Sequence, residues 1–128
     1  MSSTNRRAAT GTSGEAQARR YLEARGYTFI AQNWYCQSGE LDLIMLDGNE
    51  LVFVEVKTRR GERSGRAGES VSDSKARKLL DSGEWFIGTH PKYEDLAWRC
   101  DLVAITIHPT TVVATVQHEI NAILDDGT

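Results

Sequence analysis

The organisation of this chain follows from residues 39–57, which read GELDLIMLDGNELVFVEVK. Two apolar runs flank Gly48-Asn49, and such a pair between two runs is typical of a tight β-hairpin. The stretch therefore predicts one strand over Glu40–Asp47 and a second over Glu50–Lys57. Residues 51–54 are all apolar, which predicts that the second strand is covered on both faces.

The register of this hairpin brings acidic side chains together. If Gly48-Asn49 is the two-residue loop, Asp42 lies directly opposite Glu55. Glu40 then lies opposite Lys57, and all four side chains point to one face because side chains alternate along a strand. Opposed residues have Cβ atoms roughly 4.5–5.5 Å apart. If the loop starts one residue earlier, Asp42 lies diagonal to Glu55 and the two acids still share a face.

Two carboxylates at this separation repel each other unless a cation neutralises them. Mg²⁺ is commonly held by one or two carboxylates together with water and substrate phosphate, so Asp42 and Glu55 are candidate ligands for Mg²⁺ or Mn²⁺. Lys57 would hold a water or a phosphate oxygen, and such a set suits hydrolysis of a phosphodiester. The alternative is that these charges are simply solvated at strand ends, since Glu-x-Lys is common by chance.

Two helices and three more strands are expected around the hairpin. Thr12-Ser13-Gly14-Glu15 fits a capping box, so a helix is predicted over residues 13–25. Ser72 is a predicted N-cap of a second helix that ends near Gly88 and Pro91. Three further strands are predicted over residues 27–35, 99–107 and 111–117, and a mobile loop over 59–70. The order αβββαββ places a helix between the third and fourth strands, as a parallel crossover requires, and predicts an α/β fold with a mixed central sheet and flanking helices.

Composition limits the remaining classes of protein. The 128 residues suit one domain, predicted over residues 12–123 between a disordered N-terminal tail, 1–11, and a C-terminal tail, 124–128. No apolar run has the length of a membrane span or of a secretory signal, so a cytoplasmic protein without a membrane partner is expected. The net charge of -3 counts against extensive contact with nucleic acid, although basic residues cluster between residues 57 and 66.

The motifs of the hairpin resemble those of the YraN family of bacterial proteins. The resemblance rests on Gly39-Glu40-Leu41-Asp42-Leu43-Ile44 and on Leu51-Val52-Phe53-Val54-Glu55-Val56-Lys57-Thr58-Arg59, and it extends over about residues 11–123. Further matches are Gly11-x-x-Gly14-Glu15, Tyr21-Leu22, Gly26-Tyr27, Asn33-Trp34, Lys75, Leu79, Arg99-x-Asp101 and Asn121-Ala122. That family belongs to the PD-(D/E)xK nuclease-like superfamily, which includes restriction endonucleases and Holliday junction resolvases.

The resemblance implies a restriction-endonuclease-like αβββαβ core and catalytic roles for Asp42, Glu55 and Lys57. Glu15 matches a metal ligand on the first helix of resolvase-like members, and its other interpretation is the capping box. The chain departs from its relatives at Gln32, Tyr35 and Gln37, where arginine is frequent, and at Cys100, where an aromatic residue is frequent. The missing arginines imply weaker or narrower phosphate binding.

Other polar residues are weighed against ordinary structural roles. Arg59, Arg60, Arg63 and Lys75 are candidate nucleic-acid contacts. A solvated loop is an equally natural place for the arginines, and an ordinary polar helix face is the more common role for the lysine. Arg99 and Asp101 share a strand face and favour a structural ion pair. The three histidines show no ligand spacing, and the three tryptophans are expected to pack in the core.

Three functions remain open at this stage. The first is a Mg²⁺- or Mn²⁺-dependent endonuclease acting on DNA, including branched or damaged DNA, in which Glu40 assists. The second is a nucleic-acid-binding accessory domain that keeps the metal site but does not cut. The third is a protein-interaction domain whose acids only solvate a sheet edge. Resolvase-like relatives act as dimers, so the resemblance allows a homodimer, but no interface is visible in the sequence.

Overall fold

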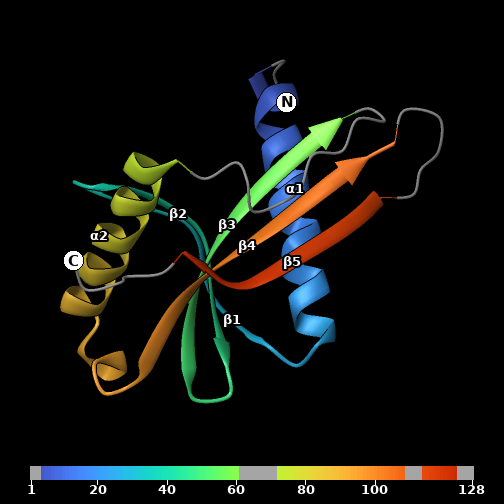
Figure 1. Cartoon of the computed structure of the whole chain (residues 1–128). Coiled ribbons are helices and arrows are strands. Elements are labelled where there is room, and N and C mark those ends of the chain that lie inside the picture. The colour runs from blue at the N-terminus through green and yellow to red at the C-terminus, as the bar shows by residue number, and fades with distance from the viewer. Residues whose placement is uncertain (1–3, 61–71, 109–113, 124–128) are drawn as a thin grey trace.

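The computed structural model describes residues 4–60, 72–108 and 114–123 (Figure 1). The elements are α1 (Thr4–Ala24), β1 (Thr28–Cys36), β2 (Gly39–Asp47), β3 (Glu50–Arg60), α2 (Asp73–Thr89), the short 3-10 helix η2 (Pro91–Tyr93), β4 (Ala97–Ile107) and β5 (Ala114–Ile123). The predicted order αβββαββ is confirmed. Within these residues no helix is both long and apolar enough to cross a membrane.

The five strands form one mixed sheet in the order β1-β2-β3-β4-β5. Among the strands that the structure describes, only the β3–β4 pair is parallel, and α2 lies in the connection between these two strands. The other neighbours are antiparallel. The predicted crossover and the mixed sheet with flanking helices are therefore confirmed, and the arrangement is a restriction-endonuclease-like core.

The central strand β3 is covered on both faces, as its apolar sequence predicted. On one face Val52 and Val54 join Ala18 and Leu22 of α1 in one core cluster. On the other face Leu51, Phe53 and Glu55 alternate with them, and the two apolar side chains pack with Leu79 and Phe86 of α2. Alternation along β3 therefore directs Glu55 toward α2.

The β2–β3 hairpin has the register predicted for a Gly48-Asn49 loop, but its ladder is shorter than predicted. Paired residues run from Asp47 opposite Glu50 to Leu43 opposite Val54. The expected pairing of Asp42 with Glu55 is wrong, because the Asp42 carboxylate instead accepts the backbone N–H of Val56 at 2.9 Å. A side chain thus takes the place of a strand carbonyl at this point.

Beyond Leu43 the two strands part, and the expected pairing of Glu40 with Lys57 is absent from the ladder as well. Figure 1 shows the first half of β2 turning away from β3 toward α2. We call this divergence the fork and the Gly48-Asn49 turn the closed end of the hairpin.

Helix α1 begins nearer the N-terminus than the sequence predicted. The capping box at residues 12–15 is wrong as a helix start, because α1 begins at Thr4 and residues 4–11 are already helical. The glycine of that motif has a packing role instead: a Cβ atom at residue 14 would overlap Thr58 Oγ1 on β3. Gly14 therefore allows α1 to approach the sheet closely, and Glu15 is carried next to the fork.

The remaining boundaries agree in part with the sequence. The Ser72 N-cap of α2 is confirmed, since Ser72 Oγ accepts the N–H of Lys75 at 3.2 Å. The predicted loop over 59–70 starts too early, because β3 continues to Arg60. The rest of that loop, the predicted start of the last strand and the C-terminal tail, 124–128, lie outside the described residues.

Candidate metal centre

Three carboxylates converge at the fork from two elements. Glu15 comes from α1, whereas Glu40 and Asp42 come from the first residues of β2, and one oxygen of each lies within 4.8 Å of the others. We call these residues the acid cluster. Several carboxylate oxygens at one point are the ligand set that Mg²⁺ and Mn²⁺ prefer.

Glu55 lies beside the acid cluster but already has a cationic partner. Its side chain is buried, and its Oε2 atom lies 2.8 Å from Nζ of Lys75 in the first turn of α2. This hydrogen bond raises the pKa of the Lys75 ammonium, although burial acts in the opposite direction. We call the acid cluster together with Glu55 and Lys75 the fork site.

The fork site opens into a cavity of about 660 Å³ between the β1–β2 hairpin and α2. Its residues are Tyr35, Cys36, Gly39, Glu40, Asp42, Glu55, Ser72, Ser74, Lys75, Lys78 and Leu79. The acids lie on the strands, whereas both lysines lie on the helix. The cavity therefore has an acidic wall and a basic wall that face each other.

The carboxylates of the acid cluster disfavour one another's ionised form. Burial and the charge of Glu55 raise the pKa of Asp42 from 3.8 to about 8, although the Val56 N–H acts in the opposite direction. Burial also raises the pKa of Glu15, assisted by Glu40 and partly offset by a hydrogen bond from Asn33. Crowded carboxylates of this kind are stabilised either by protons or by a cation.

The residues present therefore fit a divalent cation. The acid cluster supplies hard oxygen atoms at one point, and the pKa of Asp42 is raised because burial and the neighbouring carboxylates disfavour its negative charge. A bound cation would supply the missing positive charge.

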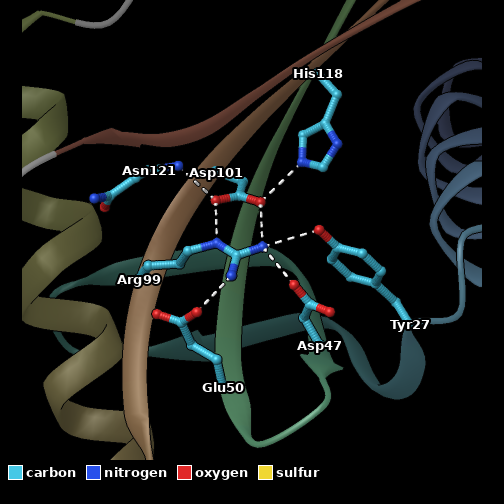
Figure 2. A network of polar contacts seen from close by, with 7 residues as sticks. All are labelled: Tyr27, Asp47, Glu50, Arg99, Asp101, His118 and Asn121. Atoms are coloured by element: carbon cyan, nitrogen blue, oxygen red, sulfur yellow. Dashed lines mark hydrogen bonds and ion pairs between the residues drawn. The ribbon is translucent and has the colours of Figure 1, made fainter.

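A second polar network lies at the closed end of the hairpin (Figure 2). The buried Arg99 donates to Asp101 at 2.9 and 3.2 Å, to Glu50 at 2.6 Å and to Asp47 at 3.2 Å. Tyr27 accepts a further hydrogen bond from Arg99 at 2.9 Å. The predicted structural ion pair of Arg99 and Asp101 is confirmed. The contacts of Arg99 with Asp47 and Glu50 join β4 to both strands of the hairpin.

Asp101 is fully buried, yet its charge is compensated. His118 Nε2 lies 2.8 Å from its Oδ2 atom, and the Asn121 N–H donates to its Oδ1 atom at 2.8 Å. Burial would raise the pKa of Asp101, but the hydrogen bonds from His118, Arg99 and Asn121 outweigh it and lower the pKa. This network uses its charges to hold the fold together.

Comparison with known proteins places the chain in a family. Residues 14–105 match the model described as "Uncharacterised protein family UPF0102". The chain belongs to the UPF0102 family. The match includes the three acids of the cluster as well as Arg99 and Asp101, whereas His118 and Asn121 lie beyond it. The predicted membership of the YraN family is confirmed.

Individual UPF0102 proteins match most of the chain. A UPF0102 protein of Roseiflexus castenholzii is 37% identical over 115 residues, which cover 90% of this chain and 93% of the relative. One from Stutzerimonas stutzeri is 44% identical over 76% of this chain and 81% of its own length. One from Ectopseudomonas mendocina is 40% identical over 88% of this chain and 94% of its own length.

Within this UPF0102 chain the structure brings together five of the predicted site residues, namely Glu15, Glu40, Asp42, Glu55 and Lys75. Lys57 is half-buried on β3, two residues beyond Glu55, and is not among the residues of the cavity. Arg59 and Arg60 are the last two residues of β3. Arg63 lies outside the described residues.

Two residues that the sequence did not single out for the site also contact the acid cluster. Asn33 adopts a left-handed backbone conformation with φ of 54°, and its side chain hydrogen-bonds Glu15. Tyr35 is 68% exposed and hydrogen-bonds Glu40, and the charge of Glu40 raises the pKa of the phenol. Asparagine tolerates a positive φ better than most residues do, but this preference alone does not point to a ligand site.

Proposed function

We propose that this UPF0102 protein is a metal-dependent endonuclease that hydrolyses phosphodiester bonds of DNA at the fork site. The observation that carries the proposal is the acid cluster, whose oxygens lie within 4.8 Å of one another and whose central member, Asp42, has its pKa raised to about 8. Carboxylates that only stabilise the fold are expected to have cationic partners beside them, as Asp101 has Arg99.

Glu15, Glu40 and Asp42 would hold Mg²⁺ or Mn²⁺, with Glu55 as a further ligand on the α2 side. When bound, the cation would polarise a phosphate oxygen and make a water molecule more acidic, which is what hydrolysis of a phosphodiester needs. Hydrogen bonds within the chain hold two of these ligands: the Val56 N–H donates to Asp42, and the Asn33 side chain hydrogen-bonds Glu15.

The charges of the two cavity walls are evidence for a polyanionic substrate. A phosphate lying against Lys75 and Lys78 on α2 would face the acidic wall across the cavity, where the cation would join the two. The net charge of -3 favours recognition through this local contact over wrapping of long duplexes. Branched and damaged DNA have short stretches of accessible backbone that a local contact of this kind could bind. A homodimer would allow two strands to be cut together.

A cleavage assay tests the proposal. Linear, nicked and branched DNA are incubated with the protein and Mn²⁺, and the Asp42→Asn variant is compared with the wild type. We expect cleavage by the wild type and a loss of about 100-fold or more in the variant, because the central carboxylate is removed. Glu50→Gln is the matched control, since it neutralises a carboxylate at the closed end, and it should cut at the wild-type rate.

The other outcomes separate the remaining functions. Equal cleavage by the wild type and Asp42→Asn would point to a contaminating nuclease and overturn the proposal. Binding of DNA and Mn²⁺ without cleavage would favour the non-catalytic accessory domain. Binding of neither would favour the protein-interaction domain.

A further inference from the structure

The lysine that reaches the carboxylates of the fork site comes from a different element than the sequence motif suggests. In the motif Glu55-Val56-Lys57 the lysine lies two residues after the glutamate on β3. In the structure, however, the ammonium group at Glu55 is that of Lys75, 2.8 Å away on α2. Among the described residues, Lys57 forms no ion pair with Glu55 or with the acid cluster.

We propose that Lys75, and not Lys57, is the lysine that binds the scissile phosphate at the fork site, and that it neutralises Glu55 while the metal is absent. This inference rests on the proposed nuclease function. It assigns the phosphate-binding amine to a residue outside the hairpin motif.

The position of Lys75 suits both roles. Its backbone N–H is bound by the Ser72 N-cap, so the first turn of α2 fixes where the side chain starts. The side chain is 49% exposed, while that of its partner Glu55 is 7% exposed. One end of the ion pair is therefore buried in the fold, and the other faces the cavity where a phosphate would enter.

Sharing of Glu55 has a consequence for metal binding. A divalent cation and the Lys75 ammonium are both attracted to the Glu55 carboxylate, so each weakens the hold of the other on it. Removal of the Lys75 ammonium should therefore tighten metal binding, even though it weakens binding of the substrate phosphate. A lysine with a merely structural role on the helix surface would not produce this combination.

Calorimetric titration with Mn²⁺ alone tests the first half of the proposal. We expect Lys75→Met to bind Mn²⁺ about five-fold or more tightly than the wild type. Lys78→Met is the matched control, because Lys78 lies one turn further along α2 in the same cavity, and among the described residues it forms no ion pair with these acids. It should leave the Mn²⁺ affinity near that of the wild type.

Cleavage kinetics with Mn²⁺ test the second half. We expect Lys75→Met to lower kcat about 100-fold and Lys57→Met to lower it less than about ten-fold. Lys75→Arg keeps the positive charge and should recover part of the lost activity. Circular dichroism of each variant establishes that the fold is retained, as expected for a half-exposed side chain.

The outcomes distinguish this inference from the proposed function. If the wild type binds Mn²⁺ and cleaves, but Lys75→Met matches it in affinity and kcat, the inference is overturned and the nuclease proposal stands. A larger loss in Lys57→Met than in Lys75→Met would also overturn it. If the wild type neither binds Mn²⁺ nor cleaves, the proposed function fails and the inference fails with it.

Discussion

The two ends of the β2–β3 hairpin carry acidic residues in opposite electrostatic situations. At the closed end, Asp47, Glu50 and Asp101 surround the guanidinium of Arg99, and His118 adds a further partner. At the fork, Glu15, Glu40 and Asp42 lie together, and the nearby Lys75 is paired with Glu55.

The pKa values express this difference. Asp101 is the more deeply buried residue, yet its pKa is lowered, because hydrogen bonds from cationic and N–H groups outweigh burial. The pKa of Asp42 is raised to about 8, because burial and neighbouring carboxylates act together. Burial alone therefore does not mark a functional acid. The informative feature is a partly buried carboxylate, such as Asp42, whose negative charge the described residues do not fully offset.

The largest effect is expected at the closed end. Arg99→Met removes the cation and leaves the fully buried Asp101 without its main partner, so the free energy of unfolding should fall by about 3–5 kcal/mol. Urea denaturation measures this change. Arg77→Met, an exposed arginine on α2, serves as the control and should change stability by less than about 0.5 kcal/mol. A loss below about 1 kcal/mol in Arg99→Met would show that the closed end is not held by charge compensation.

The contribution of Asp42 at the fork to folding stability should change with pH in the opposite sense to that of a carboxylate with a lowered pKa. The pKa of Asp42 is raised in the folded protein, so the stability linked to its proton is fully present below about 3.8 and is lost as the pH rises toward about 8. Asp101 has a lowered pKa, so its contribution is present above its ordinary pKa and is lost only as the pH falls through the lowered value.

Thermal melting of the metal-free protein in EDTA tests this pH dependence. Asp42→Asn keeps an oxygen for the Val56 N–H but has no charge, so at pH 8 it should be more stable than the wild type by at least about 1.4 kcal/mol, the equivalent of one pKa unit. The difference should shrink toward pH 4. A variant less stable than the wild type at pH 8 would contradict the uncompensated charge of the fork.

A smaller effect is expected for the second partner of Asp101. His118→Leu removes one hydrogen bond to Oδ2, but Arg99 still donates to both carboxylate oxygens. We therefore expect a loss of about 1 kcal/mol in urea denaturation. A loss as large as that of Arg99→Met would show that His118 and Arg99 act as one unit, and the double variant would measure that coupling.

Much of the fold could be predicted from local patterns. The Gly48-Asn49 turn fixed the register, the apolar run of β3 predicted burial on both faces, and Ser72 predicted the start of α2. The start of α1 could not be predicted in the same way, because the glycine of the apparent capping box serves a contact with Thr58 that is distant in sequence.

The candidate site was predictable only in outline. Alternation along the hairpin brought Asp42 and Glu55 to one place, but it could not reveal that the ladder stops at Leu43 or that Asp42 binds the Val56 N–H. The roles of Lys75 and His118 depend on how α2 and β5 pack against the sheet. Neither residue has a local sequence pattern that signals its partner.

The most direct test of the difference between the two ends is the melting temperature at pH 8 with and without Mn²⁺. A cation that binds only the folded state stabilises it, so the account predicts a rise of several degrees in the wild type and in Glu50→Gln, and no rise in Asp42→Asn. An unchanged melting temperature in the wild type, or an equal rise in Asp42→Asn, would contradict a metal centre at the fork.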